Sequence, residues 1–535
     1  MHPMRFVPTG LPVLRHRRAM NFTITIDGRN VDVHSGMSVL DAARKIGIDI
    51  PTLCYLEKCG AINSCLVCLV KLNGKLVPAC GTKVQPGMAI ESETPEVHDA
   101  RRTALELILS DHVGDCLGPC HRLCPLDLNV PLMLRDVASG KLDHAIVTVQ
   151  TALPMPRILG RLCHHPCEQG CRRGAWDKPL AIRGIECMVA DTNAASPAPY
   201  IPHSKPTTGK RVAVVGAGPT GLAAAWFLAL EGHSVTVFDR QPRPGGTLRA
   251  VDPNLLPLDV LESELALFAQ LGINFEPNTE IGKNVGLESI ESQFSAVLLA
   301  TGQLNDQNHP FRGIPAAGGA IEIDSETFQT KRPGVFAAGS AVRPARHLVK
   351  ALSEGKAVAH CISLALQGKP VRRPQKPFSS VIGRLERAEL EIFVRGTSTH
   401  SRQTDIGKQT DSDKKNFATE AARCLHCDCR AAGNCDLQHY AQVYNASAGR
   451  FKGHRRPFEQ QWRPGGIIFE PGKCILCGIC VRLAELGGEP LGLAFVGRGF
   501  NVRLAAPFGH SVDEGLQKVG AECVAQCPTG ALSTP

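Results

Sequence analysis

No apolar run in this 535-residue chain reaches the length of about 20 residues that a membrane-spanning helix needs. Residues 1–20 are basic but lack the apolar segment of a secretory signal. We therefore expect a cytoplasmic protein with no transmembrane segment, in a reducing compartment where disulfides are rare. The length excludes a single domain and predicts three to five.

Cysteine is present in excess, with 22 copies. Many of them stand in Cys-x2-Cys runs, and thiols this close in sequence form strained disulfides but good metal sites. Zinc remains an alternative to iron–sulfur clusters. The five groups are Cys54/Cys65/Cys68/Cys80, Cys116/Cys120/Cys124, Cys163/Cys167/Cys171, Cys424/Cys427/Cys429/Cys435 and Cys474/Cys477/Cys480 with Cys523/Cys527.

The formal charge of +9 does not indicate nucleic-acid binding. Four arginines lie within residues 1–20, which contain no acid and are either a disordered arm or a segment ahead of a start at Met20. Each thiolate-bound cluster carries roughly −1 to −2, so about five clusters would bring the protein near neutrality. The basic balance therefore supports no nucleic-acid partner.

Residues 21–98 predict a β-grasp ferredoxin. Two strands flank Asp27-Gly28, Ser38 caps a helix predicted over 39–46, and a hairpin turns at Asn73-Gly74. Strands and a helix around a cysteine loop suit a [2Fe–2S] cluster. The set Cys54, Cys65, Cys68 and Cys80 resembles that domain in the large iron–sulfur subunit of respiratory complex I and in related hydrogenases. A set that includes Cys59 is the alternative.

Residues 99–192 resemble two different families, one in their first part and another in the rest. His112-x3-Cys116 resembles the complex I segment that begins a [4Fe–4S] site. The following Cys120-x3-Cys124-Pro and Gly160-Arg-Leu-Cys163-x3-Cys167-Glu motifs resemble the helical domain of the glutamate synthase small subunit, which dihydropyrimidine dehydrogenase shares. That resemblance implies two [4Fe–4S] clusters whose ligands interleave along the chain.

The family pattern assigns three thiolates to each of these clusters. One cluster takes Cys116, Cys120 and Cys171, and the other takes Cys124, Cys163 and Cys167. The family begins with Cys-x2-Cys-x4-Cys, so this chain lacks one thiolate of the first cluster. His112 is the predicted replacement, since imidazole also binds iron; the alternative is a packing residue beside a degenerate cluster. Glu186 is the predicted fourth ligand of the second cluster, with Cys187 as its rival.

Residues 210–370 contain a dinucleotide-binding turn. A strand over 211–215 precedes Gly216-x-Gly218-Pro219-x-Gly221, a helix is predicted over 222–230, and a second strand ends in Asp239. In this arrangement the helix amides hold a pyrophosphate and the acid holds a ribose hydroxyl.

Other segments of this domain resemble the FAD-binding segments of the glutamate synthase small subunit, so the resemblance implies FAD. These segments are Pro244-Gly245-Gly246-Thr-Leu-Arg249, Ala300-Thr301-Gly302 and Gly334-Val-Phe-Ala-Ala-Gly339. Ser340 stands where the family has an Asp that meets the ribityl chain. The predicted FAD-binding residues are Gly216, Gly218, Pro219, Gly221, Asp239, Gly245, Gly246, Arg249, Thr301, Gly302 and Gly339.

The NADPH-binding half of that family is missing. The family inserts a second Rossmann unit between the last two FAD-binding segments, and only the 31 residues 303–333 separate them here. One βαβ unit already takes about 30 residues, and no second glycine fingerprint is present. We therefore predict that the chain has no nicotinamide site of its own.

Two further clusters are predicted near the C-terminus. Cys424, Cys427, Cys429 and Cys435 suit one [4Fe–4S] cluster, and the Cys-x5-Cys-x-Leu-Gln ending resembles complex I. Residues 470–535 resemble a bacterial ferredoxin that has lost one cluster, because Ala484 replaces one ligand. The predicted ligands of the remaining cluster are Cys474, Cys477, Cys480 and Cys527, with Cys523 as a remnant.

The predicted fold class is a multidomain α/β and α+β protein. It combines a β-grasp ferredoxin, an α-helical iron–sulfur domain, a Rossmann-like FAD domain without its NADPH-binding insert, and a C-terminal bacterial ferredoxin-like domain. The predicted boundaries are a basic tail (1–20), the [2Fe–2S] domain (21–98), the helical domain (99–192), a linker (193–209), the FAD domain (210–370), a connector (371–417) with a helix over 385–394, and the C-terminal domain (418–535).

The predicted function is that of an electron-transfer subunit with one FAD, one [2Fe–2S] cluster and up to four [4Fe–4S] clusters. Its expected partners are other redox subunits, such as formate dehydrogenase, hydrogenase or NADH-dehydrogenase-like modules. Two alternatives remain open. One is a self-sufficient NAD(P)H-dependent oxidoreductase of the glutamate synthase small-subunit type, and the other is a structural scaffold with vestigial cofactors.

Overall fold

The computed structural model describes residues 20–304, 311, 313–344, 346–403, 411–463 and 465–534. The predicted basic tail therefore lies outside the described residues, except for Met20. The chain forms two compact units: unit 1 comprises residues 1–116, 378–383 and 430–535, and unit 2 comprises residues 117–377 and 384–429. Unit 1 is thus built from segments that unit 2 separates along the sequence. None of the described helices is long and apolar enough to cross a bilayer.

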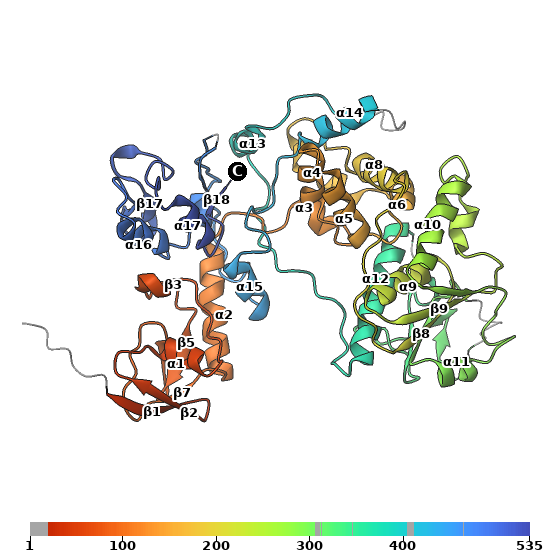
Figure 1. The fold of residues 1–535 in the computed structure, drawn as a ribbon, viewed down its shortest axis with the longest axis horizontal. Helices are drawn as coiled ribbons and strands as arrows, with labels where there is room; N and C mark the ends of the chain where they lie inside the picture. The colour runs from red at the N-terminus through yellow and green to blue at the C-terminus, as the bar shows by residue number, and fades with distance from the viewer. Residues whose placement is uncertain are drawn as a thin grey trace, which may run out of the picture. The chain divides into compact units, whose positions relative to one another are not determined.

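Unit 1 begins with a mixed five-stranded sheet of strand order β2-β1-β7-β5-β6 (Figure 1). Ser38 caps helix α1 with a complete capping box, and its side chain accepts from the Asp41 N–H at 3.1 Å. The predicted strands, turns and helix are confirmed. The elements are β1 (Asn21–Ile26), β2 (Arg29–His34), α1 (Val39–Lys45), β3 (Tyr55–Leu56), β4 (Gly60–Ala61), β5 (Leu69–Leu72), β6 (Lys75–Pro78) and β7 (Ala89–Glu91).

The rest of unit 1 joins an N-terminal helix to the C-terminal segment. Leu105 and Leu109 of that helix share one buried cluster with Leu437, Leu483 and Leu532. Burying these apolar side chains together stabilises a pairing of segments far apart in sequence. The elements are α2 (Pro95–Ser110), α15 (Asp436–Val443), β15 (Ile468–Phe469), α16 (Ile479–Leu486), β16 (Ala494–Val496), β17 (Arg503–Ala505), α17 (Gly520–Ala525) and β18 (Leu532–Ser533).

Unit 2 contains a five-stranded parallel sheet of order β10-β9-β8-β11-β14. The predicted strand–turn–helix–strand is confirmed, and its helix begins at Pro219, three residues before the predicted start. Pro is favoured at the first helical position because its missing N–H would have no partner there. The elements are β8 (Arg211–Val215), α9 (Pro219–Leu230), β9 (Ser234–Phe238), α10 (Leu258–Gln270), β10 (Asn274–Glu276), α11 (Leu287–Gln293), β11 (Ala296–Leu299), β12 (Ala316–Ala317), β13 (Ala320–Ile321), β14 (Val335–Ala337) and α12 (Leu348–Leu366).

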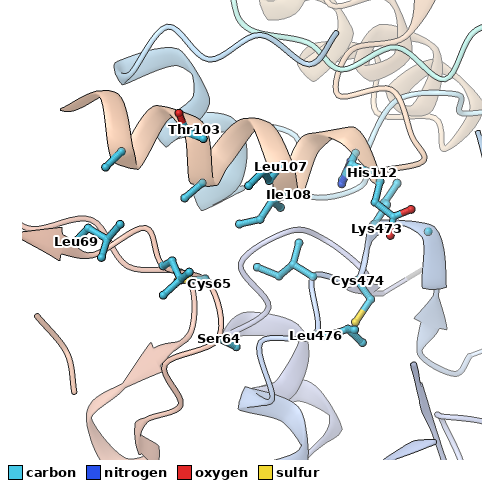
Figure 2. A pocket seen from close by; sticks show the side chains of 16 residues that line it. Ser64, Cys65, Leu69, Thr103, Leu107, Ile108, His112, Lys473, Cys474 and Leu476 are labelled. Atoms are coloured by element: carbon cyan, nitrogen blue, oxygen red, sulfur yellow. The ribbon is translucent and has the colours of Figure 1, made fainter. Parts of the chain in front are cut away.

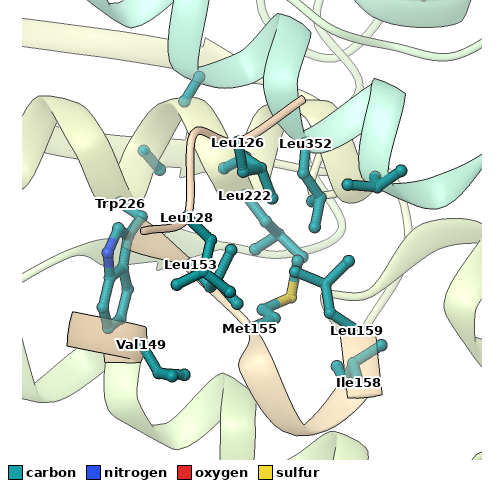
Figure 3. Close-up of a cluster of buried hydrophobic side chains, with 14 of the residues drawn as sticks. Leu126, Leu128, Val149, Leu153, Met155, Ile158, Leu159, Leu222, Trp226 and Leu352 are labelled. Atoms are coloured by element: carbon teal, nitrogen blue, oxygen red, sulfur yellow. The ribbon is translucent and has the colours of Figure 1, made fainter. Parts of the chain in front are cut away.

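A helical subdomain packs on this sheet domain through a common core. Leu126, Leu153 and Met155 from the helical part meet Leu222 and Trp226 of α9 (Figure 3). One continuous apolar cluster therefore holds the two parts of unit 2 together. The helices are α3 (Pro119–Leu123), α4 (Val130–Ala138), α5 (Leu142–Ala152), α6 (Pro156–Leu162), α7 (Pro166–Gln169), α8 (Ile182–Ala194), α13 (Arg387–Val394) and α14 (Asp411–Ala421).

Gly355 lets α12 lie directly against α9. A Cβ at this position would stand 2.4 Å from Thr220 O and 2.7 Å from Ala223 Cβ. We expect Gly355→Ala to lower the free energy of unfolding by about 1–3 kcal/mol through overpacking, although alanine is the better helix former. Urea titration followed by circular dichroism measures the change.

His360→Ala is the matched control, because His360 is an exposed residue of the same helix. It should change stability by no more than about 0.5 kcal/mol. Equal stability of both variants would contradict the close packing at Gly355.

Candidate functional site

Unit 1 brings the first four predicted cysteines together. Cys54 accepts hydrogen bonds from the Cys65 and Cys80 thiols, which lower its pKa to about 2. Cys68 Sγ donates to Cys80 Sγ at 3.4 Å. All four are buried, and four mutually adjacent sulfurs fit the donor set of a [2Fe–2S] cluster.

Cys59 lies apart from this group. It ends a short 3₁₀ turn (Glu57–Cys59) and is half-buried. The charged groups around it are Lys58, Arg482 and Glu522, and burial raises its pKa. The structure therefore favours the predicted set without Cys59.

The structure also brings the C-terminal cysteines together. Cys474, Cys477, Cys480 and Cys527 line one small cavity together with Cys523. Burial raises the pKa of Cys477 to about 12, with smaller contributions from the thiols of Cys527, Cys474 and Cys54. The Cys523 thiol donates to Cys480 O at 3.9 Å. Cys54 and Cys477, which come from two different cysteine groups, also belong to one buried cluster of unit 1.

A pocket of about 600 Å³ lies between these two groups in unit 1 (Figure 2). Cys65 and Cys474 line it from the two cysteine loops, and Leu107, Ile108 and His112 line it from the α2 side. The pocket wall is mostly apolar. Its position shows that the two cysteine loops and the end of α2 form one local structure.

His112 and Cys116 also lie in unit 1, whereas Cys120 and Cys171 lie in unit 2. His112 is buried, its Nδ1 atom has no hydrogen-bond partner among the described residues, and burial lowers its pKa to about 4. Cys116 Sγ lies 3.3 Å from Ser380 Oγ. The same short segment, 378–383, contacts the helix after Cys435, because Gln438 Nε2 donates to Phe378 O at 2.8 Å.

Unit 2 groups cysteines from both ends of its sequence. Burial raises the pKa of Cys120 well above its ordinary value, with further contributions from the neighbouring thiols of Cys424, Cys171 and Cys427. Burial also raises the pKa of Cys424, beside Cys427 and Cys171. The sequence-based set paired Cys120 and Cys171 with Cys116 and His112 instead. The structure places Cys424-x2-Cys427 where the family's Cys-x2-Cys was expected.

A buried charge network fastens these two chain segments. Arg173 lies two residues after Cys171 and donates to the carbonyl of Arg423, directly before Cys424, at 3.0 Å. Arg423 pairs with Glu420 at 2.8 Å and with Asp177 at 2.9 Å. Asp177 also pairs with Arg173 at 2.8 Å. Both guanidinium groups are about 1% exposed, so their charges are compensated inside the protein.

The second group of unit 2 agrees with the predicted set. Cys124, Cys163 and Cys167 each have Glu186 among the neighbours that raise their pKa values, after burial itself. Burial raises the pKa of Glu186 to about 8. Its rival Cys187 instead contacts Arg161 at 3.3 Å and Asp191 at 3.6 Å. The structure therefore places Glu186, and not Cys187, with the three thiols.

Three cysteine loops share one strained turn that the sequence analysis missed. His165, His426 and Leu476, each two residues after a cysteine, have positive φ angles of 45°, 46° and 55°. The N–H groups of His165 and His426 donate to Cys163 Sγ and Cys424 Sγ, both at 3.4 Å. Non-glycine residues adopt this conformation at a cost, most often at functional sites. Amides aimed at sulfur suit thiolates, whose negative charge they stabilise.

The cysteine groups are not arranged as binding sites for a single metal ion. Among the described residues, no three His, Cys, Asp or Glu side chains converge closely enough to hold one metal ion. The donors of an iron–sulfur cluster bind several iron atoms rather than one.

The predicted dinucleotide loop has the close contacts that its glycines require. A Cβ on Gly221 would lie 1.9 Å from Gly216 O, and one on Gly246 would lie 2.7 Å from Gly218 Cα. A Cβ on Gly339 would lie 2.5 Å from Thr220 Oγ1. Gly218 differs, because a Cβ there would meet no protein atom within 4 Å. The space beside Gly218, at the start of α9, is therefore open for a bound group.

The polar residues of the loop are largely engaged with the protein. Asp239 accepts from the Ala217 N–H at 2.6 Å and from the Gln241 N–H at 2.8 Å. Arg249 pairs with Glu262 at 2.9 Å. Thr301 Oγ1 is buried with no partner among the described residues. An orphaned buried hydroxyl fits a site completed by a ligand. The other predicted positions, Pro219, Gly245 and Gly302, lie in the same loops.

The strands that flank the expected NADPH-binding insert are direct neighbours. β11 pairs with β14 in parallel register, and the described residues between them form only the β12–β13 hairpin. Within the described part of 303–333 there is no second Rossmann unit. The loss of the NADPH-binding insert stays a prediction.

Three family descriptions match the chain in order. They are a 2Fe-2S iron-sulfur cluster binding domain (residues 19–95), a dihydropyrimidine dehydrogenase domain II with a 4Fe-4S cluster (111–197) and an NAD(P)-binding Rossmann-like domain (214–268). The matches confirm a protein with ferredoxin-type, 4Fe-4S and Rossmann-like domains, and they confirm the predicted composite resemblance.

Similar proteins are oxidoreductase subunits. The NADP(+)-dependent formate dehydrogenase subunit beta of Moorella thermoacetica is 34% identical over 35% of this chain and 29% of that subunit. The glutamate synthase [NADPH] small chain of Bacillus subtilis is 36% identical over 39% of this chain and 42% of that protein. The chain thus spans less than half the length of these curated relatives. A solved NAD+-reducing [NiFe]-hydrogenase is 33% identical over 17% of this chain and 38% of that chain, at a TM-score of 0.16.

Substitutions at two glycines of the loop should have different effects, one on dinucleotide binding and the other on stability. Gly218→Ala should leave the free energy of unfolding within about 0.5 kcal/mol, because its Cβ meets no protein atom, but it should lower dinucleotide content by filling the space beside the helix N-terminus. Gly221→Ala should destabilise the protein itself. Absorbance of the released dinucleotide and urea unfolding measure the two effects.

The two variants are each other's control. Full dinucleotide content in Gly218→Ala would show that the ligand does not approach this part of the loop.

Proposed function

We propose that this chain is an electron-transfer subunit of a multi-subunit oxidoreductase and that it carries one FAD and five iron–sulfur clusters. The observation that supports this most strongly is the pocket of unit 1 that Cys65 and Cys474, from two different cysteine groups, line together. Two clusters this close form a path for single electrons. The named activities of the relatives support redox partners of the formate dehydrogenase, hydrogenase or Fe(3+) reductase kind.

The geometry revises the ligand sets that we propose. The [2Fe–2S] cluster takes Cys54, Cys65, Cys68 and Cys80. The C-terminal [4Fe–4S] cluster takes Cys474, Cys477, Cys480 and Cys527. In unit 2, one [4Fe–4S] cluster takes Cys120, Cys171, Cys424 and Cys427, and the other takes Cys124, Cys163, Cys167 and Glu186. Of the predicted ligands, His112, Cys116, Cys429 and Cys435 remain as donors for another [4Fe–4S] cluster.

The protein's part in the reaction is to hold and insulate these groups. Iron–sulfur clusters exchange one electron at a time, and FAD exchanges one or two. The buried thiols keep water from the clusters, and the amides of His165 and His426 stabilise charge on Cys163 and Cys424. The ring of His164, beside Cys163, stacks on His347 at the start of α12, with centroids 4.0 Å apart. One cysteine loop therefore touches the dinucleotide domain.

A nicotinamide in the Gly216 loop is the second candidate. The family matched over residues 214–268 is described as NAD(P)-binding, and a chain that bound NAD(P)H there would be a self-sufficient oxidoreductase. The shortened segment between β11 and β14 supports FAD in this loop with no nicotinamide beside it.

The revised unit 2 set predicts that Cys424→Ser removes cluster iron held by Cys120. We expect the iron content of anaerobically purified protein to fall by up to about four atoms per chain, and the same loss in Cys120→Ser. The double variant should lose no more iron than either single variant, because all four thiols serve one cluster.

Cys187→Ser is the matched control, since this cysteine is half-buried in the same unit but turned toward Arg161 and Asp191. It should retain full iron content. Additive losses in Cys120→Ser/Cys424→Ser would mean that the two thiols belong to separate clusters.

The absence of a nicotinamide lobe predicts that NADH and NADPH leave the flavin oxidised. Stopped-flow absorbance near the flavin band should show no fast bleaching with either nucleotide, whereas dithionite should reduce the flavin and the clusters. Rapid bleaching by NADPH in the isolated chain would establish the second candidate.

A further inference from the structure

A basic and apolar hairpin stands on the surface of unit 1. We define the basic hairpin as residues 494–510, which contain β16 and β17. All three residues of β16 are exposed. The side chain of Phe508 is 93% exposed and its backbone has a positive φ of 56°, which is unfavourable for a non-glycine residue. An aromatic side chain held outward on strained backbone indicates a contact surface.

The charge of the basic hairpin has one sign. No Asp or Glu occurs between Glu489 and Asp513, whereas Arg498 and Arg503 lie within this stretch and are exposed. Neither arginine forms an ion pair or a side-chain hydrogen bond with another described residue. By contrast, the exposed Arg482 of α16 pairs with Glu485. Unpaired guanidinium groups beside exposed apolar side chains suit an acidic protein surface.

The basic hairpin also lies against the C-terminal cysteine group. Leu504 of β17 lines the same small cavity as Cys474, Cys477 and Cys527. A Cβ on Gly478, next to Cys477, would lie 3.8 Å from Phe495 Cε2. A protein bound to the hairpin would therefore be placed beside the C-terminal cluster.

We propose that the basic hairpin is the docking surface for a small acidic one-electron carrier protein of the ferredoxin kind. This rests on the proposed function, because it names the partner of the C-terminal cluster. Electron-transfer encounters bury little surface, typically less than about 1,200 Å², so two arginines and a few exposed apolar side chains are sufficient. In the exchange, one electron leaves the reduced cluster and reduces the oxidised carrier. No proton moves and no bond forms.

The test measures binding and electron transfer separately. The probes are an acidic [2Fe–2S] ferredoxin and its gallium-substituted, redox-inactive form. Gallium ferredoxin should bind the holoprotein, and stopped-flow oxidation of the dithionite-reduced holoprotein by the iron form should be fast at low salt. The double variant Arg498→Glu/Arg503→Glu should lower the association rate constant by about 10-fold or more. The difference should shrink at high ionic strength, where charges are screened.

The matched control is Arg29→Glu/Lys75→Glu. It makes the same change in net charge with two exposed residues of the β-grasp sheet, and it should retain the wild-type rate. Phe508→Ser should raise the dissociation rate of gallium ferredoxin without altering the salt dependence. For a basic cytochrome c, Arg498 and Arg503 should not raise the association rate constant.

The outcomes separate this proposal from the proposed function. If gallium ferredoxin binds through the hairpin but the chain contains no iron, docking stands and the proposed function fails. Equal association rates for the hairpin variant and its control would overturn the docking surface. So would a dimer of this chain, seen by sedimentation, that Arg498→Glu/Arg503→Glu dissociates.

Discussion

The organisation of unit 2 depends on one network of charges, formed by the buried residues Arg173, Glu420 and Arg423 together with the more exposed Asp177. Breaking the fully buried Arg423–Glu420 pair by removing one partner would cost about 3–5 kcal/mol. The network gains directional hydrogen bonds that apolar packing would not provide, such as the bond from Arg173 to the carbonyl before Cys424. It therefore fixes which sulfur atoms meet, although segments about 250 residues apart supply them.

The same constraint explains which parts of the site the sequence could predict. The sets around Cys54 and Cys474 were predictable, because most of their members are close in sequence and share a local loop. Glu186 was predictable only through a family resemblance. The partners of Cys120 were not, because Cys424 and Cys427 formed a complete-looking motif with Cys429 and Cys435. Only the three-dimensional contacts separate Cys424 and Cys427, which belong to unit 2, from Cys435, which belongs to unit 1.

Local signals predicted the regular elements well for a physical reason. Asp27-Gly28 and Asn73-Gly74 both form turns with positive φ at both residues, which these residue pairs accommodate with little strain. The left-handed turns at His165, His426 and Leu476 have a weaker signal, since histidine adopts this conformation less readily than glycine and leucine has no preference for it. They form because the neighbouring cysteine needs an amide donor, which becomes evident only when the sulfur is in place. The cytoplasmic location stays a prediction.

The chain order of the two units suggests how the cofactors depend on one another. His112-x3-Cys116 and the Cys-x5-Cys-x-Leu-Gln segment both resemble complex I, yet almost all of unit 2 lies between them in sequence. Cys116 ends one segment of unit 1, and residues 430–535 resume it after unit 2. The donors His112, Cys116 and Cys435 can therefore assemble only if the ends of unit 2 are held near each other. Arg423 lies near the C-terminal end of unit 2, and its bonds with Arg173 and Asp177 hold this end against the segment that follows Cys171. Folding of unit 2 would thus be a condition for completing a cluster in unit 1.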